Sequence, residues 1–287
     1  MGLFKKDPFG NYIIFKRMVI FIFGFISFRR YHAFNKLKVD NNILLKNLPD
    51  NNVLFVSNHQ TYFADVAAMF HVFASSNNGL YHKTNNPLVF FRPKLNLYFV
   101  AAKETMTSGI LPKIFGYAGG ILIQRTWREA GKAIKRQVDG NDTESIGIAL
   151  KDGWVITFPQ GTTRAFNPGR KGTAFMIKEY KPIVVPVVIN GFRRAYDKKG
   201  LNIRVKGVNL SMTFKQPLDI DYENESVESI MDKVMNGIEQ APIFNRVRPL
   251  EHLRPEYPRY PSEEFVKRSR KTRLKQRLHK KKMAPLT

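Results

Sequence analysis

The sequence predicts an α/β fold in which a mixed, largely parallel sheet is flanked by helices. Three observations lead to this prediction. Short, almost wholly apolar runs with the length of buried strands recur along the chain, and stretches with helical spacing lie between them. Polar residues capable of chemistry directly follow several of these runs, as expected at the carboxyl edge of an α/β sheet. The length of 287 residues suits one domain with appendages.

An uncharged apolar segment, residues 18–28, precedes the expected sheet, with Lys16-Arg17 before it and Arg29-Arg30 after it. As a helix it would measure about 16 Å, against about 30 Å for the hydrocarbon core of a bilayer, so a simple span is disfavoured. We therefore expect residues 1–38 to be membrane-associating, with a helix in one leaflet and basic side chains reaching lipid phosphates. The alternative is a buried core helix. A signal peptide fits less well, because arginines follow instead of a small-residue cleavage site.

The first strand expected in the sheet covers residues 53–56, and His59 follows its end. Residues 62–73 have the dense apolar pattern of a buried helix. Asp65 is six residues from His59, about 600° around a regular helix, so the two can meet only if His59 lies outside the helix. Asp65 would then hold the imidazole in the tautomer that a general base needs. The alternative is a surface histidine beside a helix-start aspartate.

The middle of the chain continues the alternation. Residues 97–102 are expected as a strand that ends at Lys103, and residues 121–123 as a strand that delivers Arg125. A short helical segment with a proline near its start, residues 110–118, lies between them. Helical spacing returns over two stretches that a turn at residues 139–142 separates; these are residues 127–138 and 143–150.

A clear strand at residues 154–158 is followed by a polar loop that contains Gln160, Gly161, Thr162 and Arg164. Such loops can hold a phosphate through backbone N–H groups and a bidentate arginine. The remaining elements follow in order: a helix at 174–179, an edge strand or strand end at 182–189 around Pro186, a hairpin at 202–208 and 211–214, and an amphipathic helix at 226–239. The compact fold is expected to end near residue 242, followed by a flexible basic tail.

Charge and composition limit the classes of partner and chemistry. The chain carries 47 Lys and Arg against 23 Asp and Glu, a net charge of +24, which predicts an anionic partner. Residues 267–282 hold ten of these basic residues and no acid, so this stretch could touch anionic lipid, an acidic carrier protein or RNA, or be a solvated end. The absence of cysteine excludes disulfides, thiolate nucleophiles and sulfur-ligated metals.

Four blocks, taken in order, resemble the glycerolipid acyltransferase family, that of bacterial 1-acylglycerol-3-phosphate acyltransferase. The third block, Phe-Pro-Gln-Gly-Thr-Thr-Arg, is similar to the family's Phe-Pro-Glu-Gly-Thr-Arg-Ser. The four blocks are residues 58–65, 119–125, 158–164 and 183–187, and the positions of Lys103 and Lys171 are also similar. The resemblance extends over roughly residues 40–220.

The resemblance implies a catalytic domain at residues 39–242 that transfers an acyl group from acyl-CoA or acidic acyl carrier protein. The acceptor would be the hydroxyl of a lyso-glycerophospholipid, 1-acylglycerol-3-phosphate in the first place. It implies His59 as general base oriented by Asp65, without cofactor or metal. The acceptor phosphate would be held by six residues: Lys103, Arg125, Gln160, Gly161, Thr162 and Arg164. The place implied is the cytoplasmic face of the cell membrane, as a monotopic or peripheral protein with anionic lipid as partner and no nucleic acid.

Two departures from the family pattern concern the site. Five residues instead of four separate His59 from Asp65, so the turn must absorb one residue. Gln160 replaces a glutamate, and Arg164 comes one position late. Two alternatives therefore stay open. One is an O-acyltransferase of the same superfamily with another acceptor, such as a lyso-aminolipid. The other is a catalytically silent basic protein that binds membrane or RNA.

Overall fold

The computed structural model describes residues 5–81, 83–107, 109–124 and 140–245, together with two short strands at 128–129 and 132–133. The described residues up to Asn245 form one compact unit. Its main sheet has the strand order β1-β9-β8-β2-β7-β3-β4. The strands of this sheet are β1 (Lys36–Asp40), β2 (Val53–Ser57), β3 (Leu97–Ala102), β4 (Gly120–Ile123), β7 (Trp154–Thr157), β8 (Ile183–Asn190) and β9 (Asn209–Phe214).

Five neighbouring strands, β8, β2, β7, β3 and β4, run parallel to one another. β9 pairs antiparallel with β8, and β1 pairs parallel with β9. The sheet is therefore mixed and largely parallel, which confirms the predicted fold class. The chain moves from β2 to β3 in one direction along the sheet and from β4 through β7 to β8 in the other. Since crossovers are right-handed, this reversal places the connecting helices on opposite faces.

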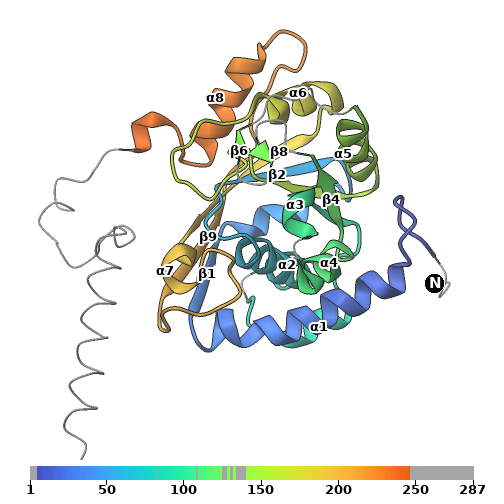
Figure 1. Ribbon diagram of the computed structural model, residues 1–287, viewed down its shortest axis with the longest axis vertical. Helices are drawn as coiled ribbons and strands as arrows, with labels where there is room; N and C mark the ends of the chain where they lie inside the picture. The colour runs from blue at the N-terminus through green and yellow to red at the C-terminus, as the bar shows by residue number, and fades with distance from the viewer. Residues whose placement is uncertain are drawn as a thin grey trace, which may run out of the picture. The chain divides into compact units, whose positions relative to one another are not determined.

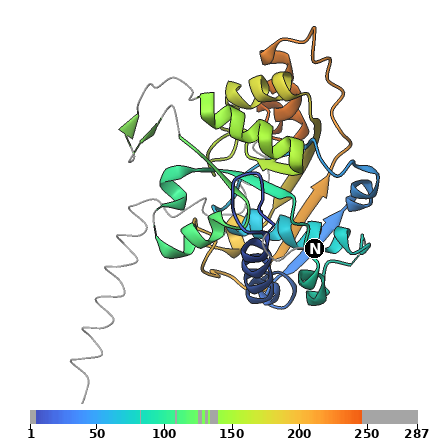
Figure 2. The same cartoon turned by 90° about the vertical axis from the view of Figure 1, so that its right-hand side faces the viewer.

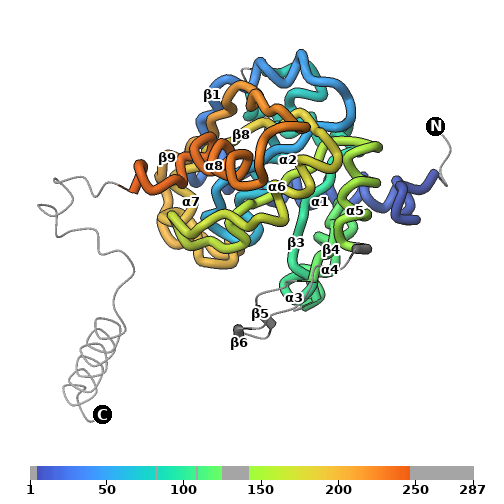
Figure 3. The backbone as a smooth tube through the Cα atoms, turned by 90° about the horizontal axis from the view of Figure 1, so that it is seen from above, coloured from blue at the N-terminus to red at the C-terminus, as the bar shows by residue number. Residues whose placement is uncertain are grey.

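Helices cover both faces of the sheet (Figure 1). On one face lie α1 (Ile13–His32), α2 (Ala64–Asn77) and the 3₁₀ segment η2 (Pro87–Phe91). On the other lie α5 (Gly140–Asp152), α6 (Lys171–Tyr180) and α8 (Val227–Gly237). Figure 2 shows the two helical layers from the side, and in Figure 3 α6 runs between α5 and α8. The shorter segments are η1 (Asn42–Asn47), α3 (Lys103–Met106), α4 (Ile110–Gly116), α7 (Phe192–Ala195) and η3 (Pro242–Phe244).

The side chains of β2 alternate between the two apolar cores, one on each face of the sheet, as expected for a central strand. Val53 and Phe55 belong to the apolar core beneath α1 and α2, whereas Leu54 and Val56 belong to the core beneath α5, α6 and α8. All four side chains are fully buried. A strand covered on both faces needs apolar residues at every position, which is the uninterrupted pattern that the sequence has.

The N-terminal helix differs from the expectation in one respect. α1 passes without a break through Lys16 and Arg17, and the side chain of Lys16 is buried against the ring of Tyr98, 3.8 Å from its centroid. Lys16 therefore does not extend toward solvent or lipid phosphates. Val19 and Ile20 are part of the core, so the inner side of α1 matches the alternative of a core helix. Among the described residues, no helix combines the length and apolar character needed to cross a bilayer.

Three further expectations were wrong. The strand around Pro186 was expected at an edge or as a strand end, but β8 lies inside the sheet, paired with β2 on one side and β9 on the other. Within the predicted helix at 127–138, β5 (Arg128–Glu129) and β6 (Lys132–Ala133) pair as antiparallel strands, and the sequence places a glycine, which weakens helices, at position 131. The predicted hairpin at 202–214 does not form, because β9 pairs with β8 and with the unpredicted β1 instead. The basic tail predicted at residues 243–287 lies, from residue 246 onward, outside the described part of the chain.

Candidate active site

His59 lies in an irregular turn between the carboxyl end of β2 and the start of α2. The preceding residue fixes this turn to the neighbouring strand β8. The Asn58 side-chain amide donates to the carbonyl oxygen of Ile189 at 2.9 Å, and its oxygen accepts from the Ile189 N–H at 2.8 Å. Both bonds are buried, so they make a strong, directional link. The position of His59 at the sheet edge is thereby set by the two central strands.

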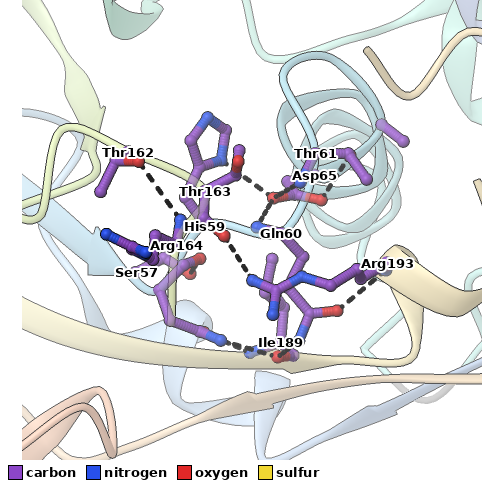
Figure 4. Close-up of polar contacts among 12 residues, drawn as sticks. Ser57, His59, Gln60, Thr61, Asp65, Thr162, Thr163, Arg164, Ile189 and Arg193 are labelled. Atoms are coloured by element: carbon purple, nitrogen blue, oxygen red, sulfur yellow. Dashed lines mark hydrogen bonds and ion pairs between the residues drawn. The ribbon is translucent and has the colours of Figure 1, made fainter. Parts of the chain in front are cut away.

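Asp65 reaches back from the first turn of α2 and binds the histidine (Figure 4). Its Oδ2 atom lies 2.9 Å from Nδ1 of His59 and accepts from the backbone N–H groups of Gln60 and Thr61 at 2.5 and 2.9 Å. Its Oδ1 atom accepts from the Thr61 hydroxyl at 2.8 Å. The extra spacer residue is absorbed because residues 60 and 61 wrap around the carboxylate instead of joining the helix. The contact that the sequence predicts is present.

The hydrogen bonds determine which ring nitrogen of His59 is available for chemistry. An ionised carboxylate can only accept hydrogen bonds, so Nδ1, the ring nitrogen bonded to Asp65, carries the proton. Nε2 then has the free lone pair. The His59 ring stacks on Phe158, with centroids 3.9 Å apart and planes at 23°. The His59 side chain is 13% exposed and that of Asp65 is fully buried. The imidazole is thus held on two sides, and Nε2 has the state of a general base.

The third sequence block follows β7 and lies beside the histidine. Gly161, with φ of +61°, closes a tight turn in which its N–H donates to the carbonyl oxygen of Phe158 at 2.9 Å. Gly161 and Thr162 line the cavity that His59 also lines. Gln160 is 1% exposed, and its amide donates to the carbonyl oxygen of Asn167 at 2.9 Å. Gln160 therefore fixes the loop from inside, and the structure does not place it on the cavity wall.

The other predicted phosphate ligands are dispersed. Arg164 is exposed and does not belong to the cavity wall, because the additional threonine before it moves it outward. Lys103 is exposed at the start of α3 and is also outside the wall, although its neighbours Ala101 and Ala102 line it. Arg125 lies outside the described residues. These positions stay predictions as acceptor ligands.

Three basic residues outside the predicted set of phosphate ligands also lie at the site. Arg193 joins the first and third blocks (Figure 4): its backbone N–H donates to the side-chain oxygen of Gln60 at 3.1 Å, and its guanidinium donates to the carbonyl oxygen of Thr163. Arg170 and Lys171, at the start of α6, line the cavity. Their signal in the sequence was their position beyond the strands of the third and fourth blocks.

The cavity next to His59 has a volume of about 480 Å³, within the range of small-molecule sites. Its wall is mostly apolar and comes from α1, α2 and β3; representative residues are Ile20, Phe23, Val66, Phe70 and Phe99. Polar groups come from the loop after β7 and the start of α6, from Gln124, Asp142 and Thr143, and from Ser27 and His71 on the side of α1 and α2. A long apolar group bearing a reactive polar end fits this arrangement.

Metal ligation has no candidate within the described ranges, where no three histidine, aspartate or glutamate side chains gather in a way that could hold an ion.

The comparison with family models agrees with the resemblance of the four blocks. A family model described as Acyltransferase matches residues 38–190, more than half of the chain. Among solved structures, the crystal structure of the 1-acyl-sn-glycerophosphate acyltransferase PlsC from Thermotoga maritima is similar, with 19% identity, a TM-score of 0.46 and coverage of 78% of each chain. No curated protein matches. On the extent of the family match, which includes His59, Asp65, β2, β7 and all of β8, the chain belongs to the acyltransferase family.

Proposed function

We propose that the protein transfers an acyl group from an acyl-CoA or acyl carrier protein thioester to the free hydroxyl of a lyso-glycerophospholipid, with 1-acylglycerol-3-phosphate as the acceptor and phosphatidate as the product. The observation that carries this proposal is the His59–Asp65 pair at an apolar cavity. A base alone would serve many reactions, but a base beside a mostly apolar cavity suits a substrate with a long hydrocarbon chain.

The reaction follows from the state of the imidazole. Nε2 of His59 removes the proton of the acceptor hydroxyl while its oxygen attacks the thioester carbonyl carbon. A C–O bond forms, and the C–S bond breaks when the tetrahedral intermediate collapses. The imidazolium then returns the proton to the departing thiolate. Asp65 stabilises the positive ring and keeps its orientation. Base catalysis of this kind contributes about 10² to 10⁴ in rate, so positioning must supply the remainder.

Positive charge near the cavity supports a phosphorylated acceptor. Arg170 and Lys171 line the cavity at the start of α6, where the helix dipole also favours an anion. Partial burial lowers the pKa of Arg170 from its ordinary value, since desolvation penalises the charged form. A phosphate placed beside it would offset this penalty. We therefore propose Arg170 and Lys171, together with Thr162, as the nearest groups to the acceptor phosphate.

A second candidate acceptor is favoured by the position of Arg164. It is exposed and off the cavity wall, although the family resemblance implies it as a phosphate ligand. An acceptor such as a lyso-aminolipid would not need that contact. Purified protein given labelled acyl-CoA or acyl carrier protein and a panel of lyso-lipids separates the two acceptors, with the product's acylated position read out. A transfer that prefers lysophosphatidate supports the first proposal, and one that prefers a lyso-aminolipid supports the second.

We further propose that the enzyme works at a membrane surface, as a monotopic or peripheral protein on the cytoplasmic face. The outer side of α1 exposes the apolar residues Ile14, Met18, Ile22 and Ile26. They are offset by two positions, about 200° around a helix, from the buried stripe of the same helix. Exposed apolar residues of η2 and α4 extend the surface: Leu88, Phe91, Ile110, Leu111 and Ile114. This outer apolar surface, combined with a net charge of +24, suits an anionic lipid surface.

A further inference from the structure

His71 lies on α2 in the wall of the cavity, beyond the groups that the proposed reaction uses. The α2 residues that line the cavity are Val66, Ala67, Phe70 and His71, which share one helix face. At 1.5 Å rise per residue, His71 lies about 9 Å farther along the helix axis than Asp65. A hydrocarbon chain that starts near His59 and follows this face therefore passes His71 part-way along its length.

The His71 imidazole is enclosed by aromatic rings. It is 1% exposed, with the ring centroid of Phe90 at 4.6 Å and that of Tyr31 at 4.9 Å, both edge-to-face. Gly24 of α1 makes this packing possible, because a Cβ atom there would lie 2.3 Å from the Phe90 ring. Burial, and then the nearby His32, hold the pKa of His71 well below its usual value. His71 is therefore a neutral imidazole at physiological pH.

One ring nitrogen of His71 is bonded and the other is not. The Ser27 hydroxyl donates to the carbonyl oxygen of Phe23 at 2.6 Å, so its oxygen can accept from Nε2–H of His71 at 2.8 Å. In a neutral ring Nδ1 is then an acceptor. Within the described part of the chain, Nδ1 is buried and has no hydrogen-bond partner. A buried acceptor without a partner is unfavourable, and here it belongs to a ring in the wall of a cavity that the proposed function assigns to an acyl chain.

We propose that Nδ1 of His71 accepts a hydrogen bond from a hydroxyl group carried part-way along the acyl chain of the donor, so that the enzyme selects hydroxylated acyl donors. The inference rests on the proposed function, which places this chain in the cavity. An unsubstituted hydrocarbon chain would leave Nδ1 without a partner, whereas an O–H group on the chain supplies the missing donor. Sites that hydrogen-bond a substrate hydroxyl discriminate strongly against the analogue that lacks it. The distance along α2 favours a hydroxyl near the middle of the chain over one beside the carbonyl.

The test compares acyl-CoA donors of one length with the full-length protein. One donor is unsubstituted, and three carry a hydroxyl beside the carbonyl, near the middle or near the methyl end. We expect kcat/KM for the mid-chain isomer to exceed that for the unsubstituted donor by about tenfold or more. The result is measured on unaltered protein, so it does not depend on whether any variant folds.

Two variants with matched chemistry extend the test. His71→Leu should abolish the preference for the mid-chain isomer while transfer from the unsubstituted donor persists. His32→Phe is the control, because His32 is a neighbouring histidine that does not line the cavity, and its preference should equal that of the unaltered protein.

The outcomes separate the two proposals. Transfer from unsubstituted donors with no preference for any hydroxylated isomer overturns the inference and leaves the proposed function standing. The same holds if His71→Leu keeps the preference. If no donor, on CoA or on carrier protein, is transferred to any lyso-lipid, the proposed function itself fails and the inference with it.

Discussion

Asp65 determines the orientation and protonation of His59, because its carboxylate accepts hydrogen bonds from His59, Gln60 and Thr61. Replacing it with asparagine would exchange one accepting oxygen for an NH₂ group and remove the negative charge that stabilises the protonated ring of His59. We expect Asp65→Asn to lower kcat by about 10²-fold or more, and His59→Ala at least as much. Single-turnover measurements with labelled donor test this.

Asp50→Asn is the matched control for that prediction. Asp50 also binds a basic side chain, with its carboxylate 2.5 Å from Nζ of Lys94, but it precedes β2 at the opposite edge of the sheet. Its replacement should leave kcat within about twofold of normal, because the pair contacts none of the residues of the site. A near-normal rate in correctly folded Asp65→Asn would mean that another group orients His59.

The two arginines near the third block allow a second test at the scale of single residues. Lysine cannot reproduce the two parallel hydrogen bonds of an arginine to a phosphate. Arg170→Lys should raise KM for lysophosphatidate by about tenfold, while Arg164→Lys should change it by less than about threefold. Steady-state kinetics with the acceptor varied at saturating donor gives both values. The reverse order of effects would move the phosphate toward Arg164, as the family resemblance implies.

At the scale of elements, α1 contains a buried lysine, Lys16, whose charged form is unfavourable in the folded protein. Burial lowers the pKa of Lys16 to about 8, with the charges of Asp7 and Asp152 acting in the opposite direction. Its pKa in the unfolded chain is the ordinary 10.5, so the unfolded state binds more protons between pH 8 and 10.5. Stability therefore rises with pH through this window, and below pH 8 the charged lysine costs roughly 3 kcal/mol.

Lys16→Met should remove this cost. We expect a higher melting temperature at pH 7, by several degrees, and no rise of stability between pH 8 and 10.5. Lys46→Met, an exposed lysine of η1, should change neither. Calorimetry across the pH range measures both effects, and an unchanged pH profile in Lys16→Met would show that the ammonium is solvated in the native protein.

His32, near the C-terminal end of α1, predicts a pH response of the same sign in a more acidic window. Burial lowers the pKa of His32 to about 4, from an ordinary 6.5. The unfolded chain then binds more protons between pH 6.5 and 4, so stability is complete above this window and falls as the pH is lowered through it. His32→Phe should flatten the fall, as urea unfolding at pH 7, 5.5 and 4.5 would reveal. A loss of stability as steep as in the unaltered protein would assign the acid response to other groups.

Elements were predictable where the sequence pattern is local. β2, β3, β7 and β8 are apolar at nearly every position, and buried strands need nothing else to be recognised. β1 was missed because the segment Lys36–Asp40 alternates charge with Leu37 and Val39 at the sheet edge, and its partner β9 lies far away in sequence. The His59–Asp65 contact could be stated as a geometric condition. The sequence did not predict that Arg193 joins two blocks of the site or that Arg170 and His71 line the cavity. These contacts depend on which loops and helices meet in space.

On the scale of the whole molecule, apolar residues from three segments should act together at a lipid surface. We expect the triple variant Ile22→Ser, Phe25→Ser, Ile26→Ser to lower partitioning onto anionic vesicles by at least about tenfold, because exposed apolar area of α1 is lost. Vesicle sedimentation at several salt concentrations separates this loss from the electrostatic part, which salt weakens. Ile148→Ser, on α5, is the control and should bind normally.

The division of α1 into two sides also bears on how the proposed membrane binding could be removed. Its inner side supplies Val19 and Ile20 to the core and Phe23 to the cavity, so cutting the helix away would remove part of the enzyme's interior together with the proposed lipid-binding surface. The proposed lipid-binding surface and part of the domain's interior therefore belong to the same helix. A form that does not bind membranes, for kinetics or crystallisation, is therefore to be sought by replacing the exposed apolar residues on the outer side of α1 with polar ones. Deleting the N-terminal residues would not serve this purpose.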